Sequence, residues 1–394
     1  MMNSRSLLLF RKSITYKLFL AATAAAVLIS TLVSVEPPEK LPTKDDNEHR
    51  QNQQLHPELF QIFGAAGPES LAFKKDGTGA AAATGPYAGV SDGRIIQWRG
   101  NESRWVNFAI TTPDRTGCDG SHDHVEAESR CGRPLGLSFN EKSGDLYIAD
   151  AYMGLLLVGS SGGLATCLAK EAQGIPFKFT NGVVVDQTSG IVYFTDSSTK
   201  FQRREYISVI LRGDSSGRLM KFDPVTYKVT VLLDGLMFPN GVALSKNGDF
   251  LLVAETTNCR ILKYWLEASR AGKVEPFAEL PGFPDNIKRN QKGEFWVAIN
   301  SRREGVFNWI LSNPWLRNFL AILPFDFTRA HSLLADYRGH GLAVKLSENG
   351  DIIQILEDKS GETWKCSSEI AEENGYLWIG SVKLPYAVKL RVSQ

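Results

Sequence analysis

A single β-rich sequence unit recurs six times along the chain, and this recurrence constrains the fold more than any other feature. In each copy a short apolar segment leads through a turn into a second apolar segment, which in the clearest copies ends in an acidic or small polar residue. The copies begin near residues 68, 133, 180, 239, 284 and 368. Short apolar runs that alternate with turn residues are typical of antiparallel strands.

A third strand with its own signature follows each copy, and turns such as Asp223-Pro224 then lead into a fourth. Four strands in each of six units predict an all-β fold, a six-bladed β-propeller with four-stranded blades, over residues 57–394. A two-sheet sandwich gives no reason for six copies, whereas in a closed ring each blade buries a face against the next. The insertion Asn308–His331 predicts a short helix pair over one mouth of the propeller or, alternatively, a lid that touches a membrane.

The first 35 residues differ in composition from the repeated units. Four basic residues precede a run from Leu18 to Val35 that contains no charge, which is the pattern that a translocon recognises. The run fits either a cleaved signal peptide or an uncleaved signal anchor, so membrane anchoring through 18–35 stays open. In both cases we expect the remaining chain to enter the secretory pathway lumen, either the endoplasmic reticulum, the vacuole or the cell exterior. Residues 36–56, with many charged residues, Gln and Pro, are expected to form a linker.

Two short motifs are consistent with a location in the lumen of the secretory pathway. Asn101 begins the sequence Asn-Glu-Ser, an acceptor for N-glycosylation, between two strand-like runs. Cys118 and Cys131 bracket a polar loop, and a disulfide between them would fit an oxidising compartment. The formal net charge of +1 gives no electrostatic basis for binding nucleic acid. We expect a monomeric protein with a small-molecule substrate.

The first strand of each blade lines the axis of a propeller, so the residues that open these strands are expected to converge on one central point. This position defines an inner ring, which consists of Glu69, Leu135, Asn181, Asn240, Asp285 (with Asn286 beside it) and Ser368. Carboxylate and amide oxygens are the ligands that Ca²⁺ prefers, and neither His nor Cys occupies the ring, which argues against zinc or iron. We therefore expect a calcium site made by the two carboxylates with Asn181, Asn240 and Asn286.

An alternative is that the Asn-Gly and Pro-Asp pairs of the inner ring are simply turn residues at strand starts. This alternative explains poorly why Glu69 and Asp285 take equivalent places in two other copies. Two carboxylates aimed at one narrow tunnel repel each other unless a cation lies between them.

Several longer strings carry a resemblance to a known family. Segments 131–136, 146–152, 185–198, 217–224 and 240–265 together resemble the strictosidine synthase-like proteins of plants, and the resemblance runs from about Glu58 to the C-terminus. It implies a six-bladed propeller related to paraoxonases and gluconolactonases, whose axis holds Ca²⁺ and whose members hydrolyse esters, lactones or organophosphates. It also implies that Glu69, Asn181, Asn240 and Asp285 match the metal-binding residues of these relatives.

Two departures from the family pattern limit the activity that this resemblance implies. Ser368 stands where strictosidine synthase has the glutamate that acts as acid and base in an amine–aldehyde condensation, and a serine hydroxyl does not exchange protons near neutral pH as a carboxylate does. Leu135 stands where paraoxonases carry a histidine. The catalytic residues, including the general base, are therefore left unassigned.

Three functions remain as hypotheses. The first is a Ca²⁺-dependent hydrolase of esters or lactones without true strictosidine synthase activity. The second is a Pictet–Spengler condensation of an amine with an aldehyde, which Ser368 disfavours. The third is a non-catalytic luminal binding propeller in which the ion only holds the blades together.

Overall fold

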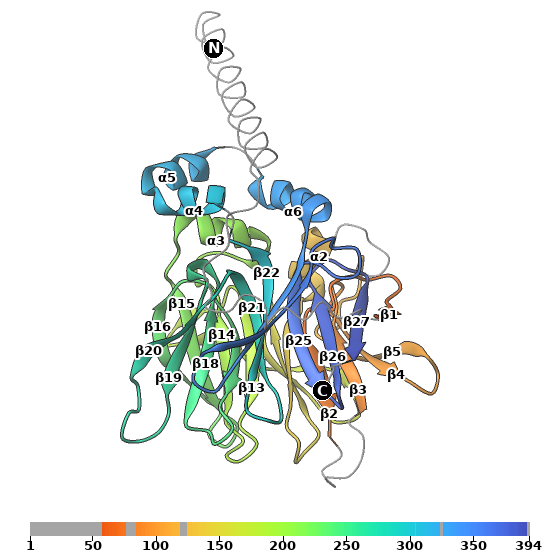
Figure 1. Cartoon of the computed structure of the whole chain (residues 1–394). Coiled ribbons are helices and arrows are strands. Elements are labelled where there is room, and N and C mark those ends of the chain that lie inside the picture. Colours follow the sequence, from red (N-terminus) through yellow and green to blue (C-terminus); the bar gives the residue numbers. More distant parts are fainter. Residues whose placement is uncertain (1–56, 76–83, 119–123, 304, 324–325, 392–394) are drawn as a thin grey trace, which may run out of the picture.

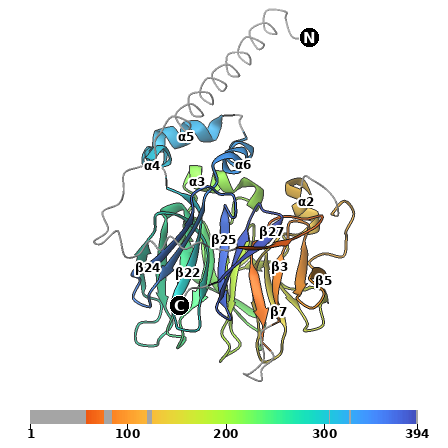
Figure 2. The same cartoon turned by 45° about the vertical axis from the view of Figure 1, so that its right-hand side comes forward.

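The computed structural model describes residues 57–75, 84–118, 124–303, 305–323 and 326–391. Within these ranges, six mainly antiparallel sheets of four or five strands stand side by side around one axis (Figure 1, Figure 2). This arrangement confirms the six-bladed β-propeller that the repeat predicts. The expected signal or anchor segment 1–35 and the linker 36–56 lie outside the described residues.

The strands of each blade follow one another from the axis outwards. The innermost strands are β2 (Leu71–Lys74), β6 (Pro134–Phe139), β13 (Thr180–Val185), β17 (Pro239–Leu244), β21 (Gly282–Arg289) and β25 (Ser367–Glu373). The second strands are β3 (Thr84–Gly89), β7 (Leu146–Asp150), β14 (Val192–Asp196), β18 (Phe250–Glu255), β22 (Phe295–Arg302) and β26 (Tyr376–Ser381). The third strands are β4 (Arg94–Arg99), β8 (Gly154–Val158), β15 (Gly217–Asp223), β19 (Arg260–Trp265), β23 (Gly341–Leu346) and β27 (Tyr386–Arg391). The outer strands are β5 (Arg104–Ile110), β10 (Thr166–Ala169), β16 (Lys228–Leu236), β20 (Val274–Glu279), β24 (Ile352–Asp358) and β1 (Glu58–Gln61).

The ring closes through the N-terminal strand. β1 precedes the first blade in sequence, yet it pairs antiparallel with β27 of the last blade. The first blade gains a fifth strand, β9 (Gly163–Leu164), which pairs parallel with β5 and which the four-strand pattern does not predict. Two further short strands, β11 (Glu171–Ala172) and β12 (Ile175–Pro176), form a separate hairpin.

The hydrophobic core lies between neighbouring blades. Every residue of β7 and of β14 is buried, because each of these strands is flanked within its own sheet and covered by the adjacent blades. One core cluster joins Tyr147 of the second blade to Phe194 and Met220 of the third. Each blade thus buries apolar surface against its neighbour, and this burial is what favours a closed ring.

Helices gather at one end of the axis (Figure 1). They are α2 (His124–Cys131), α3 (Tyr206–Arg212), α4 (Gly305–Ser312), α5 (Pro314–Ile322) and α6 (Phe327–Arg338). The predicted helix pair over 308–331 is wrong in number, because three helices occupy this insertion. Pro314 opens α5 at a position that tolerates proline, and Asp326 caps α6 by accepting a hydrogen bond from the Arg329 amide.

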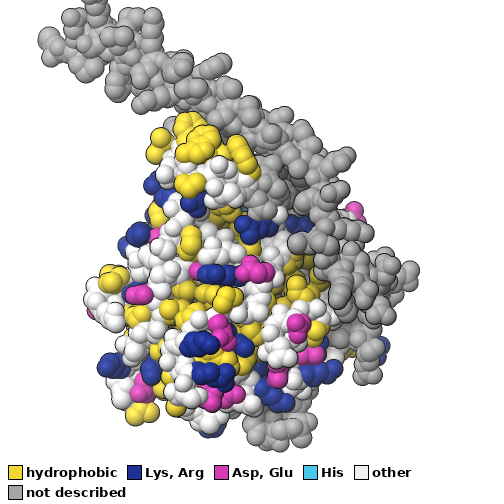
Figure 3. All heavy atoms as spheres, turned by 60° about the vertical axis from the view of Figure 1, so that its left-hand side comes forward, with side chains coloured by type: hydrophobic (Ala, Val, Ile, Leu, Met, Phe, Trp, Pro, Cys, Tyr) yellow, Lys and Arg dark blue, Asp and Glu magenta, His cyan; other side chains and the backbone are white. Residues whose placement is uncertain are grey.

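The insertion packs on α3 through Ile207, Leu211, Ile310 and Leu320. Hydrophobic side chains also gather on the molecular surface at this end (Figure 3). Trp315 of the insertion is exposed. Within the described ranges, none of the helices is long and apolar enough to span a bilayer. Contact of this insertion with a membrane stays a prediction.

The disulfide between Cys118 and Cys131 is confirmed, with the two Cα atoms 5.6 Å apart. It joins the end of α2 to the loop before it, next to the residues that lead into β6. Asn101 is exposed in the turn between β4 and β5, where glycosylation stays a prediction.

Candidate functional site

The inner strands contact one another in a closed order around the axis, β2 to β6, β13, β17, β21, β25 and back to β2. All inner-ring residues are buried: Glu69 just before β2, Leu135, Asn181, Asn240 and Ser368 at the second residue of their strands, and Asp285 and Asn286 in the middle of β21. The structure therefore brings together the residues that the repeat predicts at the axis.

Glycines after the ring residues allow this close approach. A Cβ atom on Gly182 would lie 2.6 Å from the Asn240 carbonyl oxygen, and one on Gly241 would lie 2.6 Å from the Asn286 Cα atom. Both glycines lie inside strands, and neither has a positive φ. The alternative that these Asn-Gly pairs are ordinary turns is therefore wrong, since glycine is needed here for packing between blades.

Three side-chain oxygens of the inner ring have no hydrogen-bond partner among the described residues. They are Oδ1 of Asn181, Oδ1 of Asn240 and Oδ1 of Asp285, and all three are buried. The Asn181 amide is oriented by its Nδ2 atom, which donates to Ser197 Oγ at 3.0 Å. A buried acceptor without a partner costs about 1–3 kcal/mol, so three together require an explanation.

The two carboxylates of the ring influence each other. Burial raises the pKa of Asp285 well above its ordinary value, and the nearby charge of Glu69 raises this pKa further. Burial also raises the pKa of Glu69, while Arg203 and Arg133 act in the opposite direction. Two acidic groups with raised pKa values at one buried point form a site whose charge depends on what binds there.

Glu69 already has cationic neighbours. Arg133 Nη2 donates to Glu69 Oε2 at 3.2 Å, and Arg203 Nη2 lies 3.6 Å from the same oxygen. Arg203 Nη1 also donates to Glu128 Oε1 at 2.6 Å. The expectation that an ion alone relieves the repulsion between Glu69 and Asp285 is therefore incomplete, because two arginines contact Glu69.

This cluster of arginines and glutamates is not predicted from the sequence. Arg133 immediately precedes the Pro134-Leu135 pair that opens β6, and a charged residue inside an otherwise apolar stretch was the available signal. Arg203 lies in the short 3₁₀ helix η1 (Arg203–Glu205) between β14 and α3. Arg203 contacts Glu69 of the first blade only because of the path that the chain takes between β14 and α3. No pattern in the sequence predicts this path.

The remaining inner-ring residues have other environments. The unpartnered atom of Asn286 is its amide nitrogen Nδ2, a donor, which does not suit a cation. Leu135 packs with Phe179 and Phe238. Ser368 Oγ donates to the Glu69 carbonyl oxygen at 2.7 Å and so joins the last blade to the first.

A layer of satisfied polar groups follows the inner ring along the strands. Lys288 Nζ donates to the Leu137 carbonyl oxygen at 3.2 Å and lies 3.4 Å from Glu369 Oε2. Glu369 also accepts hydrogen bonds from the Leu71 amide and from Ser70 Oγ. Lys288 thereby links three blades across the axis.

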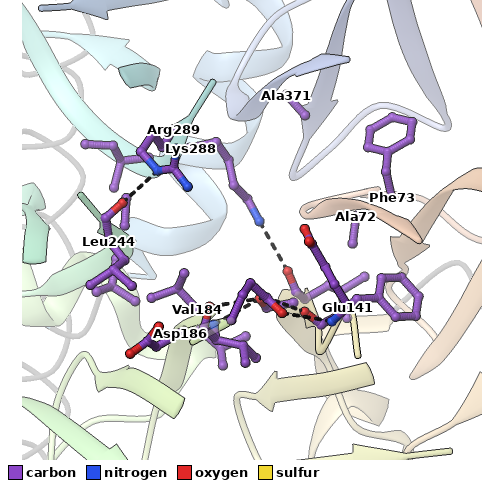
Figure 4. Close-up of a pocket in the computed structure, with 18 of the residues that line it drawn as sticks. Ala72, Phe73, Glu141, Val184, Asp186, Leu244, Lys288, Arg289 and Ala371 are labelled. Carbon is purple, nitrogen blue, oxygen red and sulfur yellow. Dashed lines mark hydrogen bonds between the residues drawn. The ribbon is translucent and has the colours of Figure 1, made fainter. Parts of the chain in front are cut away.

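A cavity of about 430 Å³ opens at the end of the inner strands that lies away from the helices. Figure 4 shows residues of several blades around it. Its walls come from the last residues of the inner strands and from the turns that follow, including Phe73, Asp186 and Glu373. Arg289 donates to the Leu244 carbonyl oxygen in this wall. The inner ring and this cavity therefore lie at opposite ends of the same strands.

The donor set of the ring is suited to a hard cation. Within the described residues, no three His, Cys, Asp or Glu side chains are grouped to hold a metal ion. A cation would depend on the amide oxygens of Asn181 and Asn240 together with the Asp285 carboxylate, with Glu69 nearby. Such mixed oxygen ligands are those of Ca²⁺ sites, and the three unpartnered oxygens fit this ion.

Solved structures with the same fold include proteins of several activities. A calcium-binding regucalcin from Agrobacterium tumefaciens has a TM-score of 0.52 and 15% identity, covering 84% of this chain and 95% of that one. A luciferin-regenerating enzyme has a TM-score of 0.52 and 10% identity, covering 85% and 95%. A protein assigned to the gluconolactonases has a TM-score of 0.51 and 14% identity, covering 86% and 95%. At these identities the likeness concerns the fold alone, which is that of the six-bladed propellers.

Sequence relatives narrow this class further. Strictosidine synthase-like 2 of Arabidopsis thaliana is 50% identical over 336 residues, 84% of this chain and 88% of the relative. Strictosidine synthase-like 10 of the same plant is 50% identical over 328 residues, 83% of this chain and 86% of the relative. The family model for strictosidine synthase matches residues 181–269. The chain belongs to the strictosidine synthase-like family.

Proposed function

We propose that this protein is a Ca²⁺-dependent hydrolase of esters or lactones. The observation that carries the proposal is the set of three buried, unpartnered oxygens on Asn181, Asn240 and Asp285. Their chemistry and burial fit a calcium ion at the axis, and a regucalcin of the same fold is described as calcium-binding. The fold of a protein assigned to the gluconolactonases supports the reaction class.

When bound, Ca²⁺ would supply a Lewis acid that polarises a substrate carbonyl. Asn181, Asn240, Asp285 and Glu69 would hold the ion. The Ser197 hydroxyl fixes the Asn181 amide by accepting from its Nδ2 atom, and it donates in turn to the Pro239 carbonyl oxygen at 2.7 Å. Arg133 and Arg203 favour the ionised form of Glu69. The chain thus keeps oxygen atoms oriented at the axis before a ligand arrives.

We further propose that the protein works as a monomer in the secretory pathway lumen, on a small-molecule substrate. The uncharged run from Leu18 to Val35 and the exposed Asn101 acceptor support this location. The Cys118–Cys131 disulfide is compatible with an oxidising compartment.

A non-catalytic role is the second candidate, and a specific set of bonds favours it. Side-chain hydroxyls join successive blades near the ring: Ser197 to Pro239, Thr256 to Pro284 and Ser368 to Glu69. An ion at the same level would add a further link between blades. Condensation of an amine with an aldehyde is less well supported, because the Ser368 hydroxyl donates to a backbone carbonyl and is completely buried.

The test is hydrolysis of a panel of aryl esters and lactones by the full chain, with Ca²⁺ or with chelator. We expect chelation or Asp285→Asn to lower the rate at least about a hundredfold, as loss of one electrostatic contact to a transition state does. Asp234→Asn, which changes an exposed carboxylate, is the matched control and should leave the rate unchanged.

Hydrolysis that is equally fast with chelator, or in Asp285→Asn, would contradict the proposal. A melting temperature that depends on Ca²⁺ without turnover on any substrate would favour the non-catalytic role. Formation of strictosidine from tryptamine and secologanin would establish the condensation instead.

A further inference from the structure

The two carboxylates of the inner ring have different partners. Glu69 Oε2 contacts Arg133 at 3.2 Å and Arg203 at 3.6 Å. Asp285 Oδ2 accepts a weak hydrogen bond from the neutral Asn300 amide at 3.4 Å, and its other oxygen is one of the three unpartnered atoms. One ligand of the proposed ion site is therefore already shared with cations of the chain, while the other is not.

The two arginines that contact Glu69 differ in their freedom to move. Arg133 is 1% exposed and so closely packed that a Cβ atom on Gly67 would collide with its Nη2 atom. Arg203 is 17% exposed and lies in η1, outside the sheets. Its shorter contact, 2.6 Å, is with Glu128. Arg203 is thus held mainly by Glu128 and could leave Glu69 without losing that partner.

Glu128 is itself held in place independently of Arg203. Tyr152 donates from its hydroxyl to Glu128 Oε2 at 2.9 Å, and Arg133 Nε lies 3.9 Å from Glu128 Oε1. The helix that carries Glu128, α2, ends at the disulfide-bonded Cys131. Glu128 therefore provides a fixed carboxylate that can still bind the Arg203 guanidinium after Arg203 has left Glu69.

We propose that Arg203 is a built-in cation that competes with the bound divalent ion for Glu69 and thereby sets the affinity of the site. In the ion-free state Arg203 contacts Glu69 and Glu128 together. In the ion-loaded state Glu69 turns to the metal, and repulsion between like charges leaves Arg203 with Glu128 alone. The inference rests on the proposed ion site and adds how that site is regulated. Because linkage is reciprocal, the ion and the Arg203–Glu69 contact weaken each other by the same factor.

The direct experiment is calorimetric titration of the full, chelator-stripped chain with Ca²⁺. We expect Arg203→Gln to bind Ca²⁺ about tenfold more tightly than the wild type, within the usual range for coupled sites. Arg204→Gln, which removes the neighbouring exposed arginine, should bind as the wild type does. The double variant Arg203→Gln/Glu128→Gln keeps the net charge of the cluster and should still bind more tightly.

A second measurement uses the unaltered protein and does not depend on a variant that folds. Phenylglyoxal modifies arginine side chains, and peptide mapping reports the rate at Arg203 separately from the others. We expect Ca²⁺ to accelerate modification of Arg203 by severalfold, because its contact with Glu69 is lost, and to leave the rate at buried Arg133 unchanged.

The outcomes separate this inference from the proposed function. If neither the wild type nor Arg203→Gln binds Ca²⁺, the ion site itself is absent and both ideas are wrong. If the wild type binds Ca²⁺ and Arg203→Gln binds no more tightly than Arg204→Gln, Arg203 does not compete and only this inference is overturned. A double variant that returns to wild-type affinity would show an effect of net charge rather than of the Glu69 contact, and would also overturn it.

Discussion

Two neighbouring layers along the propeller axis use the inner strands in opposite ways. In β21, Asp285 carries an unpartnered buried oxygen near the helix-covered end, whereas Lys288, three residues later, donates to Leu137 and faces Glu369. In the first blade, Glu69 contacts two arginines, while the next residue, Ser70, donates to Glu369. Over about 10 Å along the strands, a layer that contains polar atoms without hydrogen-bond partners gives way to a layer whose polar side chains are hydrogen-bonded.

This difference separates the buried polar groups that stabilise the fold from those that are available to bind a ligand. Each group in the Lys288–Glu369 layer has partners on other blades, so the layer locks the ring. The inner ring keeps oxygen atoms without partners, which lowers the stability of the folded chain unless something binds. Polar burial by itself would not distinguish these two layers, but the partners of each atom do.

The largest effect should come from the locking layer. Replacement of Lys288 by Met leaves Glu369 buried beside an apolar side chain, and we expect a loss of about 3 kcal/mol in the free energy of unfolding. Urea denaturation measures this loss. The double variant Lys288→Met/Glu369→Gln should recover much of it, because no unpaired charge remains. If Lys288→Met abolished Ca²⁺ binding in the folded protein, the two layers would not be independent.

A smaller loss of stability should follow from placing a glutamate at position 368, where the resemblance to strictosidine synthase implies one. In Ser368→Glu the longer side chain must enter a completely buried position where the hydroxyl now donates to the Glu69 carbonyl oxygen. We expect overpacking to lower the free energy of unfolding by about 2 kcal/mol, with no gain of condensation activity. Ser368→Ala, which only removes the hydroxyl, is the control for thermal unfolding. A stable Ser368→Glu variant that forms strictosidine would contradict our interpretation of this position.

The smallest effect concerns pH. Because burial and Glu69 raise the pKa of Asp285, the folded ion-free protein binds a proton there at pH values where the unfolded chain does not. Stability of the ion-free protein should therefore increase as pH falls from above the raised pKa towards the ordinary carboxyl value, by at most about 1.4 kcal/mol per pH unit from this group. Thermal unfolding of chelated wild type and Asp285→Asn across this range should show a shallower slope for the variant.

Binding of Ca²⁺ should have the opposite pH dependence. The ion requires the ionised carboxylate, so it must displace the proton from Asp285 below the raised pKa, and its apparent affinity should fall as the pH falls. Equal affinity on both sides of this range would show that Asp285 is not a ligand.

The fold could be predicted because the pattern of apolar and turn residues that determines each blade is repeated along the sequence. Copies such as 180–196 and 239–255 carry the same alternation of apolar and turn residues, and this pattern determines strand, order and burial at once. The same logic placed Asn181 and Asn240 at the axis, since equivalent positions of repeated blades must meet there. The disulfide followed from two cysteines that bracket one loop.

What the sequence did not disclose depends on single, unrepeated features. Arg203 and Glu128 come from connections that occur once, and their meeting at Glu69 follows from side-chain reach in the closed ring. The third helix of the insertion depends on a new helix start at Pro314 and a cap at Asp326. The fifth strand of the first blade is two residues long and too short to leave a periodic signal. The repeats allow the scaffold to be predicted, whereas the candidate site depends on positions at which the blades differ.

The pairing of β1 with β27 has a consequence for how the protein is made. Glu58 lies opposite Lys389, so the first strand of the propeller finds its partner only after the residues of the last blade have left the ribosome. Until then β1 remains an open edge that other chains could pair with. Synthesis that stops early therefore yields an unclosed ring rather than a shorter propeller. Closure of the ring therefore has to wait until β27 has been synthesised.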